Sequence, residues 1–181
     1  DQRQAGRKRL APSHSSCRWP WPIHPVTSVL LGPISRKRFS QNERSVFGFL
    51  ASAEPLGFTS FLKNTPDDGH TLYTPHMYWD YLKANMEQAI HASSDSHIWA
   101  AAIDAIERTE ARKSCTEVHV NLAKTIALID MFKAGSGLAA ENALIEICID
   151  SSSKEEIRAA LEDLARWTII AFRKHLNAWT I

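Results

Sequence analysis

Apolar residues recur every three or four positions along most of the chain, the spacing that places them on one face of an α-helix. Thr74 and Pro75 predict the start of one such helix, because proline is tolerated in the first turn. Its apolar stripe comprises Tyr78, Tyr81, Leu82, Met86 and Ile90. Asp95 or Ser96 opens a second helix. The expected buried face of that helix comprises Ile98, Trp99, Ala102, Ile103 and Ile106.

The first quarter of the chain is less regular. Residues 1–23 mix basic, Ser, Pro and Trp residues without a helical or strand period, and they predict an arm outside the folded body. A helix is expected from Pro25 to Arg38, with the proline in its first turn. Ser40 and Glu43 have the spacing of a capping box and predict the start of the next helix.

The last third contains three expected helices. A second capping-box spacing, Ser114 with Glu117, opens a strongly amphipathic helix that stops at Gly135. Its apolar face comprises Val118, Leu122, Ile126, Ile129 and Phe132. A short helix is expected over 140–149, and a further capping box that begins at Ser153 opens the third helix.

After this third helix the period changes. Residues 168–172 are β-branched and aromatic, which predicts a strand, and 178–181 form the expected returning strand of a hairpin. Three helices followed by a hairpin are typical of a winged helix, a variant of the helix-turn-helix. The sequence therefore predicts a mainly α fold, a helical bundle followed by a winged helix-turn-helix with a C-terminal β-hairpin. The expected parts are the arm over 1–23, a helical lid-like domain over 24–113 and a winged-helix domain over 114–181, truncated at its C-terminus.

Charge is unevenly distributed along the 181 residues, although the net charge is only +1. Residues 1–44 carry a balance of +7 and residues 45–181 a balance of −6. Such a basic end is found in arms that bind nucleic acid or acidic lipid, and more often in solvated tails. We favour the solvated tail, because the net charge predicts no strong affinity for nucleic acid.

The cysteine content and the absence of a leader indicate the cytoplasm. Three cysteines, Cys17, Cys115 and Cys148, are too few for a disulfide framework and suit a reducing compartment. No signal peptide and no apolar stretch of membrane-spanning length is evident, so no membrane partner is expected. The chain begins with Asp1 and stops at Ile181 within an expected strand, and we expect it to be a segment of a longer protein.

The sequence contains few residues in patterns that carry chemistry. It has no P-loop motif, so this segment is not expected to hold a nucleotide, and no nucleophile–base or metal constellation that would make it an enzyme. Cys115 and His119 have a helical spacing that a metal could use, but a structural zinc needs four ligands and no metal is expected. Aromatic residues at 73, 78, 79 and 81 could stack on bases, although at helical spacing a core position is favoured.

A winged helix can bind either DNA or another protein. Its third helix carries four carboxylates, at positions 155, 156, 162 and 163, and these repel phosphate. A winged helix that contacts protein is therefore favoured over one that reads DNA. Under the DNA alternative, the basic side chains that would contact nucleic acid are Arg36, Lys37, Arg38, Arg173 and Lys174.

Several short blocks, in order along the chain, resemble a stretch of large bacterial ATP-binding proteins. The blocks are His24–Thr27, Gly32–Pro33, Gln41–Leu50, Glu54–Phe58, Leu122–Ile129 and Ile169–Trp179. The proteins that they resemble are P-loop ATPases of the AAA+/STAND kind, some of them associated with phage defence. Residues 1–22 lie outside the resemblance.

The resemblance implies a position next to a nucleotide-binding core. The first helices would form the ATPase lid, and the winged helix would relay the nucleotide state to other domains of the same chain. Arg44 would approach the phosphates of ATP bound with Mg²⁺ by the upstream core, where a guanidinium stabilises charge on the γ-phosphoryl group. The Walker motifs are absent from this chain, so the resemblance implies a non-catalytic segment without a cofactor of its own.

Overall fold

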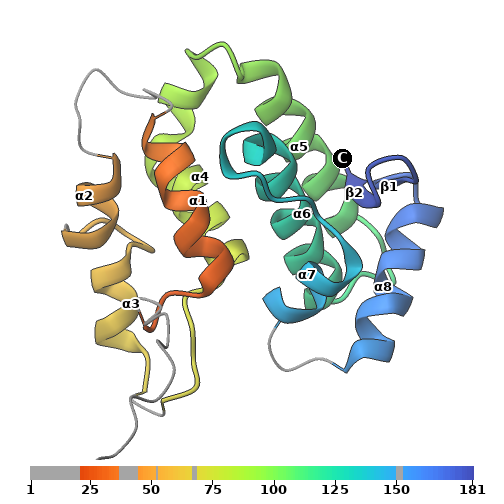
Figure 1. The fold of residues 1–181 in the computed structure, drawn as a ribbon, viewed down its shortest axis with the longest axis horizontal. Coiled ribbons are helices and arrows are strands. Elements are labelled where there is room, and N and C mark those ends of the chain that lie inside the picture. Colours follow the sequence, from red (N-terminus) through yellow and green to blue (C-terminus); the bar gives the residue numbers. More distant parts are fainter. Residues whose placement is uncertain (1–20, 37–44, 52, 67–68, 150–152) are drawn as a thin grey trace, which may run out of the picture.

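The chain forms a mainly helical body with a small C-terminal hairpin, as the sequence predicts (Figure 1). The computed structural model describes residues 21–36, 45–51, 53–66, 69–149 and 153–181. Within these ranges the helices are α1 (Pro25–Arg36), α2 (Ser45–Ala51), α3 (Phe58–Asn64), α4 (Pro75–His91), α5 (Ser96–Glu110), α6 (Glu117–Ser136), α7 (Asn142–Cys148) and α8 (Lys154–Arg166). The strands are β1 (Ala171–Arg173) and β2 (Ala178–Thr180), paired antiparallel.

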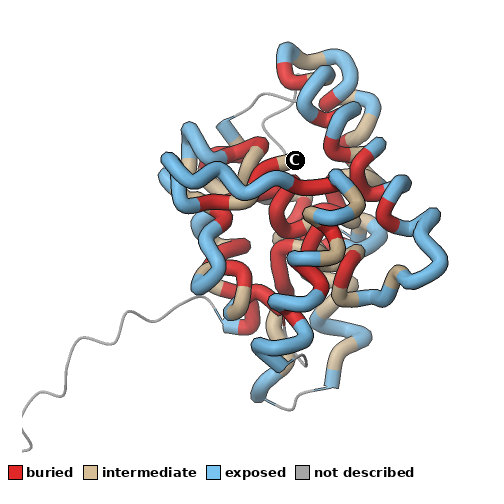
Figure 2. Tube along the Cα trace, turned by 90° about the vertical axis from the view of Figure 1, so that its right-hand side faces the viewer, coloured by how far each residue is buried: buried red, intermediate tan, exposed pale blue. Residues whose placement is uncertain are grey.

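Helix α6 lies at the centre of the fold. It packs against α1, α4, α5, α7, α8 and β2. Buried residues gather in the middle of the molecule (Figure 2). The buried apolar residues form one cluster that runs from Ile23 to Ile170, so the core continues across residue 113. The predicted division into 24–113 and 114–181 stays a prediction.

Two predicted helices have the expected starts and faces. Thr74 is the N-cap residue of α4 and Pro75 is its first residue, and all five residues of the predicted stripe are buried. Ser153 caps α8, where its hydroxyl accepts a hydrogen bond from the Glu156 backbone N–H at 3.1 Å. In α8 the predicted apolar face, Ile157, Leu161 and Leu164, is also buried.

The predicted ends of α6 are wrong by a few residues. The helix is capped by Thr116 and not by Ser114: the Thr116 side chain accepts from the His119 backbone, and the His119 ring accepts from the Thr116 N–H. The helix continues past Gly135 and ends before Gly137, which has a φ of 69°. Only glycine adopts this left-handed conformation at little cost, so Gly137 and not Gly135 terminates the helix.

Two further predictions of detail are corrected. Ile98, expected in the buried face of α5, is 38% exposed, because α5 turns Trp99, Ala102 and Ile106 toward the core. The first strand begins at Ala171 and not at residue 168. Thr168 has a φ of 56°, and the Ile169 N–H donates a hydrogen bond to the Leu164 carbonyl at 3.0 Å. These residues therefore form the turn that ends α8 and not the start of the strand.

The aromatic residues at 73, 78, 79 and 81 belong to the core, so the interpretation as a base-stacking surface is not supported. Each is at most 2% exposed. Phe49 of α2 packs edge-on against Tyr73, Tyr78 and Tyr81 at centroid distances of 4.8–5.1 Å. These aromatic contacts pack α2 against α4.

The hairpin is joined to the segment that precedes α7. Phe172 and Trp179 are cross-strand partners, and their rings meet at 5.0 Å. The Trp179 backbone N–H donates to the Ala140 carbonyl at 3.0 Å, and its indole N–H donates to Oδ1 of Asn142 at 2.7 Å. The stretch before α7 therefore lies alongside β2, on the side away from β1.

Several predictions fall on residues that the structure does not describe. They are residues 1–20 of the arm predicted over 1–23, the end of the first helix at Arg38 and the capping box of Ser40 with Glu43. The last residue of that predicted arm, Ile23, is 4% exposed and forms a bridge with Tyr73, so it belongs to the folded body. Within the described ranges, no helix is long and apolar enough to cross a bilayer.

Candidate functional site

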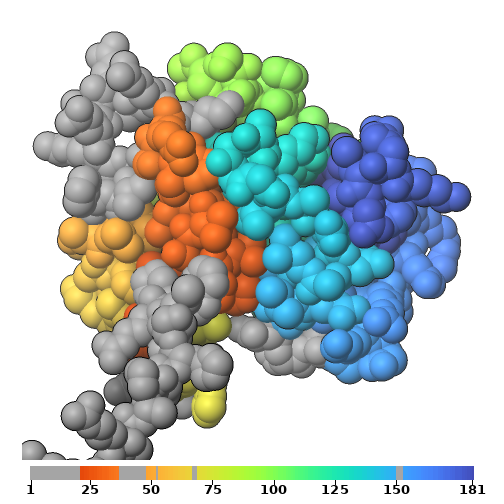
Figure 3. Space-filling model, viewed as in Figure 1, coloured from red at the N-terminus to blue at the C-terminus, as the bar shows by residue number. Residues whose placement is uncertain are grey.

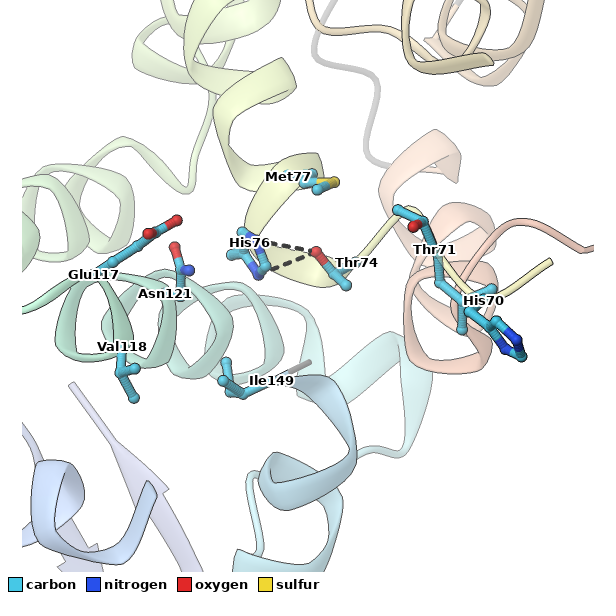
Figure 4. A pocket seen from close by; sticks show the side chains of 10 residues that line it. His70, Thr71, Thr74, His76, Met77, Glu117, Val118, Asn121 and Ile149 are labelled. Atoms are coloured by element: carbon cyan, nitrogen blue, oxygen red, sulfur yellow. Dashed lines mark hydrogen bonds between the residues drawn. The ribbon is translucent and has the colours of Figure 1, made fainter. Parts of the chain in front are cut away.

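An open cavity of about 610 Å³ lies where the N-terminal ends of α4 and α6 meet (Figure 4). Polar side chains that line it are His70, Thr71, Thr74, His76, Glu117 and Asn121. Apolar side chains that line it are Leu72, Met77, Val118 and Ile149. Ligand sites in proteins have this size and this mixture of a few polar groups with apolar walls.

The first turns of α4 and α6 position the polar side chains of the cavity, and local sequence determines where each helix begins. Thr74 and Pro75 start α4 at the edge of the cavity, so His76 lies in its first turn. The capping box of Thr116 and His119 fixes the start of α6. Glu117 and Asn121 follow at positions i and i+4, which share one face of a helix. In Figure 4 both side chains rise from α6 on the side where His76 projects from α4.

His76 is the most perturbed titratable group at the cavity. Burial lowers its pKa from 6.5 to about 4, because the charged imidazolium loses water, and the nearby carboxylates of Asp80 and Glu117 offset this only in part. Thr74 Oγ1 lies 3.0 Å from Nδ1 of the ring and holds it in position. His76 is therefore an uncharged imidazole at neutral pH.

An ion pair extends the polar strip along the α4–α6 contact. Lys124 Nζ lies 2.7 Å from Oδ1 and 3.0 Å from Oδ2 of Asp80, and the lysine side chain is only 15% exposed. Asp80 thus has its charge balanced by α6. Among the described residues, neither Glu117 nor Asn121 has a side-chain hydrogen bond or an ion pair of its own. These two groups are available to a ligand.

A second polar cluster joins α6 to α8. The His119 ring accepts from the Thr116 N–H through Nδ1, and its Nε2 faces Oδ2 of Asp163 at 3.6 Å. The ring stacks on Trp167 with a centroid distance of 4.9 Å. His119 is buried, so this cluster joins two helices and offers no open site. Over the described part of the chain, no group of three His, Cys, Asp or Glu side chains could hold a metal.

Only three of the predicted site residues, Arg36, Arg173 and Lys174, lie in the described part of the chain. Arg44, Lys37 and Arg38 lie outside the described residues. Arg36 is exposed at the end of α1, where its Nε donates to the Gly32 carbonyl at 3.3 Å. In Figure 3 the atoms of α6 separate α1 from the hairpin on the face shown. On that face α1 therefore does not adjoin the hairpin.

The hairpin cations are exposed. Arg173 ends β1, and its Nε donates to the hydroxyl of Thr180 at 3.3 Å, whereas Lys174 begins the turn. Neither residue lines the cavity.

The sequence analysis did not find the cavity residues. One signal was present: Glu117, Asn121 and Lys124 recur at helical spacing along α6, a helix that is otherwise buried over most of its surface. A polar stripe on a central helix indicates a polar contact or a cavity at that face. Which of the two it is depends on α4, whose position local patterns do not show.

Comparisons with protein-family models, with curated proteins and with solved structures found no match for this chain.

Proposed function

We propose that residues 114–181 form a winged helix that contacts protein, within a non-catalytic module of a bacterial P-loop ATP-binding protein. The observation that carries the first part is the hydrogen bond from the Trp179 N–H to the Ala140 carbonyl. In a winged helix, the segment between the first two helices pairs with the last strand of the hairpin. Helices α6, α7 and α8 then correspond to its three helices, and β1 and β2 to the wing.

The charge of α8 favours a protein partner over DNA. Glu155, Glu156 and Glu162 are exposed along the helix that would face the major groove. Two of its cations, Lys154 and Arg158, both pair with Glu146 of α7, at 3.3 and 3.0 Å. Desolvation alone would raise the pKa of the Glu146 carboxyl group, but these two cations lower it. Both cations are thus engaged with a carboxylate of the protein, and the exposed glutamates on the outer face of α8 repel phosphate.

Duplex DNA is the competing partner, because Arg173, Lys174 and His175 are all exposed on the hairpin. Fluorescence anisotropy with a labelled duplex, repeated over a range of salt concentrations, separates the two. We expect weak binding with a shallow salt dependence. DNA binding would instead be established by a slope of log K against log salt of about −0.9 for each contacted phosphate. This slope should be lost in the double variant Arg173→Ala/Lys174→Ala and kept in the control Lys63→Ala.

The coupling to ATP rests on the sequence resemblance alone. Its test is the longer reading frame that contains this chain. We expect a Walker A motif within about 150–300 residues upstream of residue 1, the size of one domain. In that longer protein, Arg44→Ala should lower ATP hydrolysis by about 10³-fold, as loss of a phosphate-contacting arginine does. A reading frame without a Walker A motif, or unchanged hydrolysis in Arg44→Ala, would contradict the coupling.

A further inference from the structure

We propose that the cavity between α4 and α6 binds a primary alkylammonium group, either of a small amine or of a lysine side chain. The inference does not depend on the winged-helix proposal: Glu117 and Asn121 belong to α6, but the argument uses only the side chains that line the cavity and not what α8 or the hairpin contacts. It rests on Glu117 and Asn121, which line the cavity without polar partners among the described residues, and on the uncharged ring of His76 opposite them.

The available acceptors match the donors of an ammonium group. An ammonium has three N–H donors and no acceptor. The cavity offers a carboxylate from Glu117 and an amide oxygen from Asn121. Both ring nitrogens of His76 lie near Thr74 Oγ1, at 3.0 and 3.2 Å, and because the imidazole is uncharged at neutral pH it does not repel a cation.

The balance of charge at the cavity favours a cation over an anion. The carboxylate of Asp80 is neutralised by Lys124, whereas no cation in the described part of the chain pairs with the carboxylate of Glu117. The N-terminal ends of α4 and α6 contribute partial positive charge. Glu117, the first residue of α6, opposes that charge with a full negative one and would repel a phosphate or a carboxylate ligand.

The apolar wall suits the hydrocarbon stem of such a ligand. Met77, Val118 and Ile149 line the cavity beside the polar groups, and Ile149 is 5% exposed. Alkylammonium chains bury their methylene groups against apolar surface while the charged end stays polar. The polar and apolar parts of the cavity thus match the two ends of one ligand.

The experiment is a titration followed by two-dimensional amide NMR, with n-butylammonium chloride as the probe. Butanol and sodium butyrate serve as neutral and anionic probes of similar shape, at matched ionic strength. We expect n-butylammonium to shift the amide signals of His76, Val118 and Asn121, and the other two probes to leave them in place. N-acetyl-lysine methylamide in a parallel titration separates a lysine side chain from a free amine as the source of the group.

Variants test which side chains bind. Glu117→Gln should weaken binding at least about tenfold, and Asn121→Asp should tighten it about fivefold, since each changes the charge beside the ligand by one. Glu107→Gln, on α5 and outside the cavity, is the matched control and should bind as the parent does. Circular dichroism establishes that each variant is folded. Equal shifts with butanol, unchanged binding in Glu117→Gln, or no shifts up to about 50 mM amine would overturn the proposal.

Discussion

Lowering the pH should destabilise the folded chain through one partly buried imidazole, that of His76. In the folded protein its pKa is about 4, against 6.5 in an exposed histidine, because the charged ring would lose water on burial. The unfolded chain therefore binds a proton at a pH where the folded chain does not. Above pH 6.5 neither state is protonated, and His76 makes no pH-dependent contribution there.

The size of the effect follows from the two pKa values. One pKa unit corresponds to about 1.36 kcal/mol. The free energy of unfolding should fall as the pH drops from 6.5 toward 4, by up to about 3 kcal/mol in all, and no further below that. A loss of this size is a large share of the 5–15 kcal/mol that typically stabilises a domain.

Urea unfolding followed by tryptophan fluorescence, at several pH values between about 7.5 and 4, measures this loss. Carboxylates also titrate near the lower end, so the quantity of interest is the difference between the parent and His76→Gln at each pH. The parent should lose stability relative to His76→Gln as the pH falls. His97→Gln, which removes an exposed imidazole from α5, is the matched control.

A difference between the parent and His76→Gln that stays constant from pH 7.5 to 4 would refute the reasoning. It would mean that the folded protein accommodates the imidazolium, through Asp80 and Glu117 or through water in the cavity. A stability that rises as the pH falls would reverse the sign and show that these carboxylates outweigh the burial of the ring.

Three further predictions concern packing and caps, each measured as the free energy of unfolding in urea. Gly135→Ala should destabilise by about 1 kcal/mol, because its Cβ would lie 3.0 Å from Cβ of Pro33. Gly32→Ala should cost less, because the nearest atom beyond its chain neighbours and its own helix backbone is the flexible Arg36 side chain at 3.6 Å, and the gain in helix propensity offsets the crowding of a helical residue before Pro33. Gly137→Ala should cost about 1 kcal/mol, because the φ of 69° strains any other residue. His24→Ala should cost about 1–3 kcal/mol, because it removes the 2.8 Å hydrogen bond to the Ile147 carbonyl and an acceptor for the Val26 N–H. Equal stability of the two alanine variants at 135 and 32, or no loss at 137 or 24, would contradict these contacts.

The elements that the sequence predicted well are those whose cause is local. Thr74 and Pro75 mark the start of α4, and the stripe from Tyr78 to Ile90 shows its buried face, because both depend on residues within a few turns of one another. The hairpin follows from the aromatic residues Phe172 and Trp179 on the two sides of a polar turn, although its first strand begins three residues later than predicted. No distant residue is needed for either.

The misplaced ends of α6 show where local rules stop. Ser114 with Glu117 fits the capping-box pattern in sequence, yet Thr116 caps the helix, because His119 can replace the usual Glu or Gln as its partner. His119 is in turn held between Trp167 and Asp163, which come from the other end of the expected domain. A cap that depends on distant partners is not visible in a short window of sequence.

The sequence by itself determined the helical fold class, the faces of the amphipathic helices and the hairpin, because these follow from the periodicity of side chains along the backbone. Only the tertiary structure decided that α6 is central, that Lys124 pairs with Asp80 across 44 residues, and that His76, Glu117 and Asn121 surround one cavity. Such contacts join residues far apart in the chain. They are determined by how helices pack, and a pattern read along one helix contains no information about its neighbour.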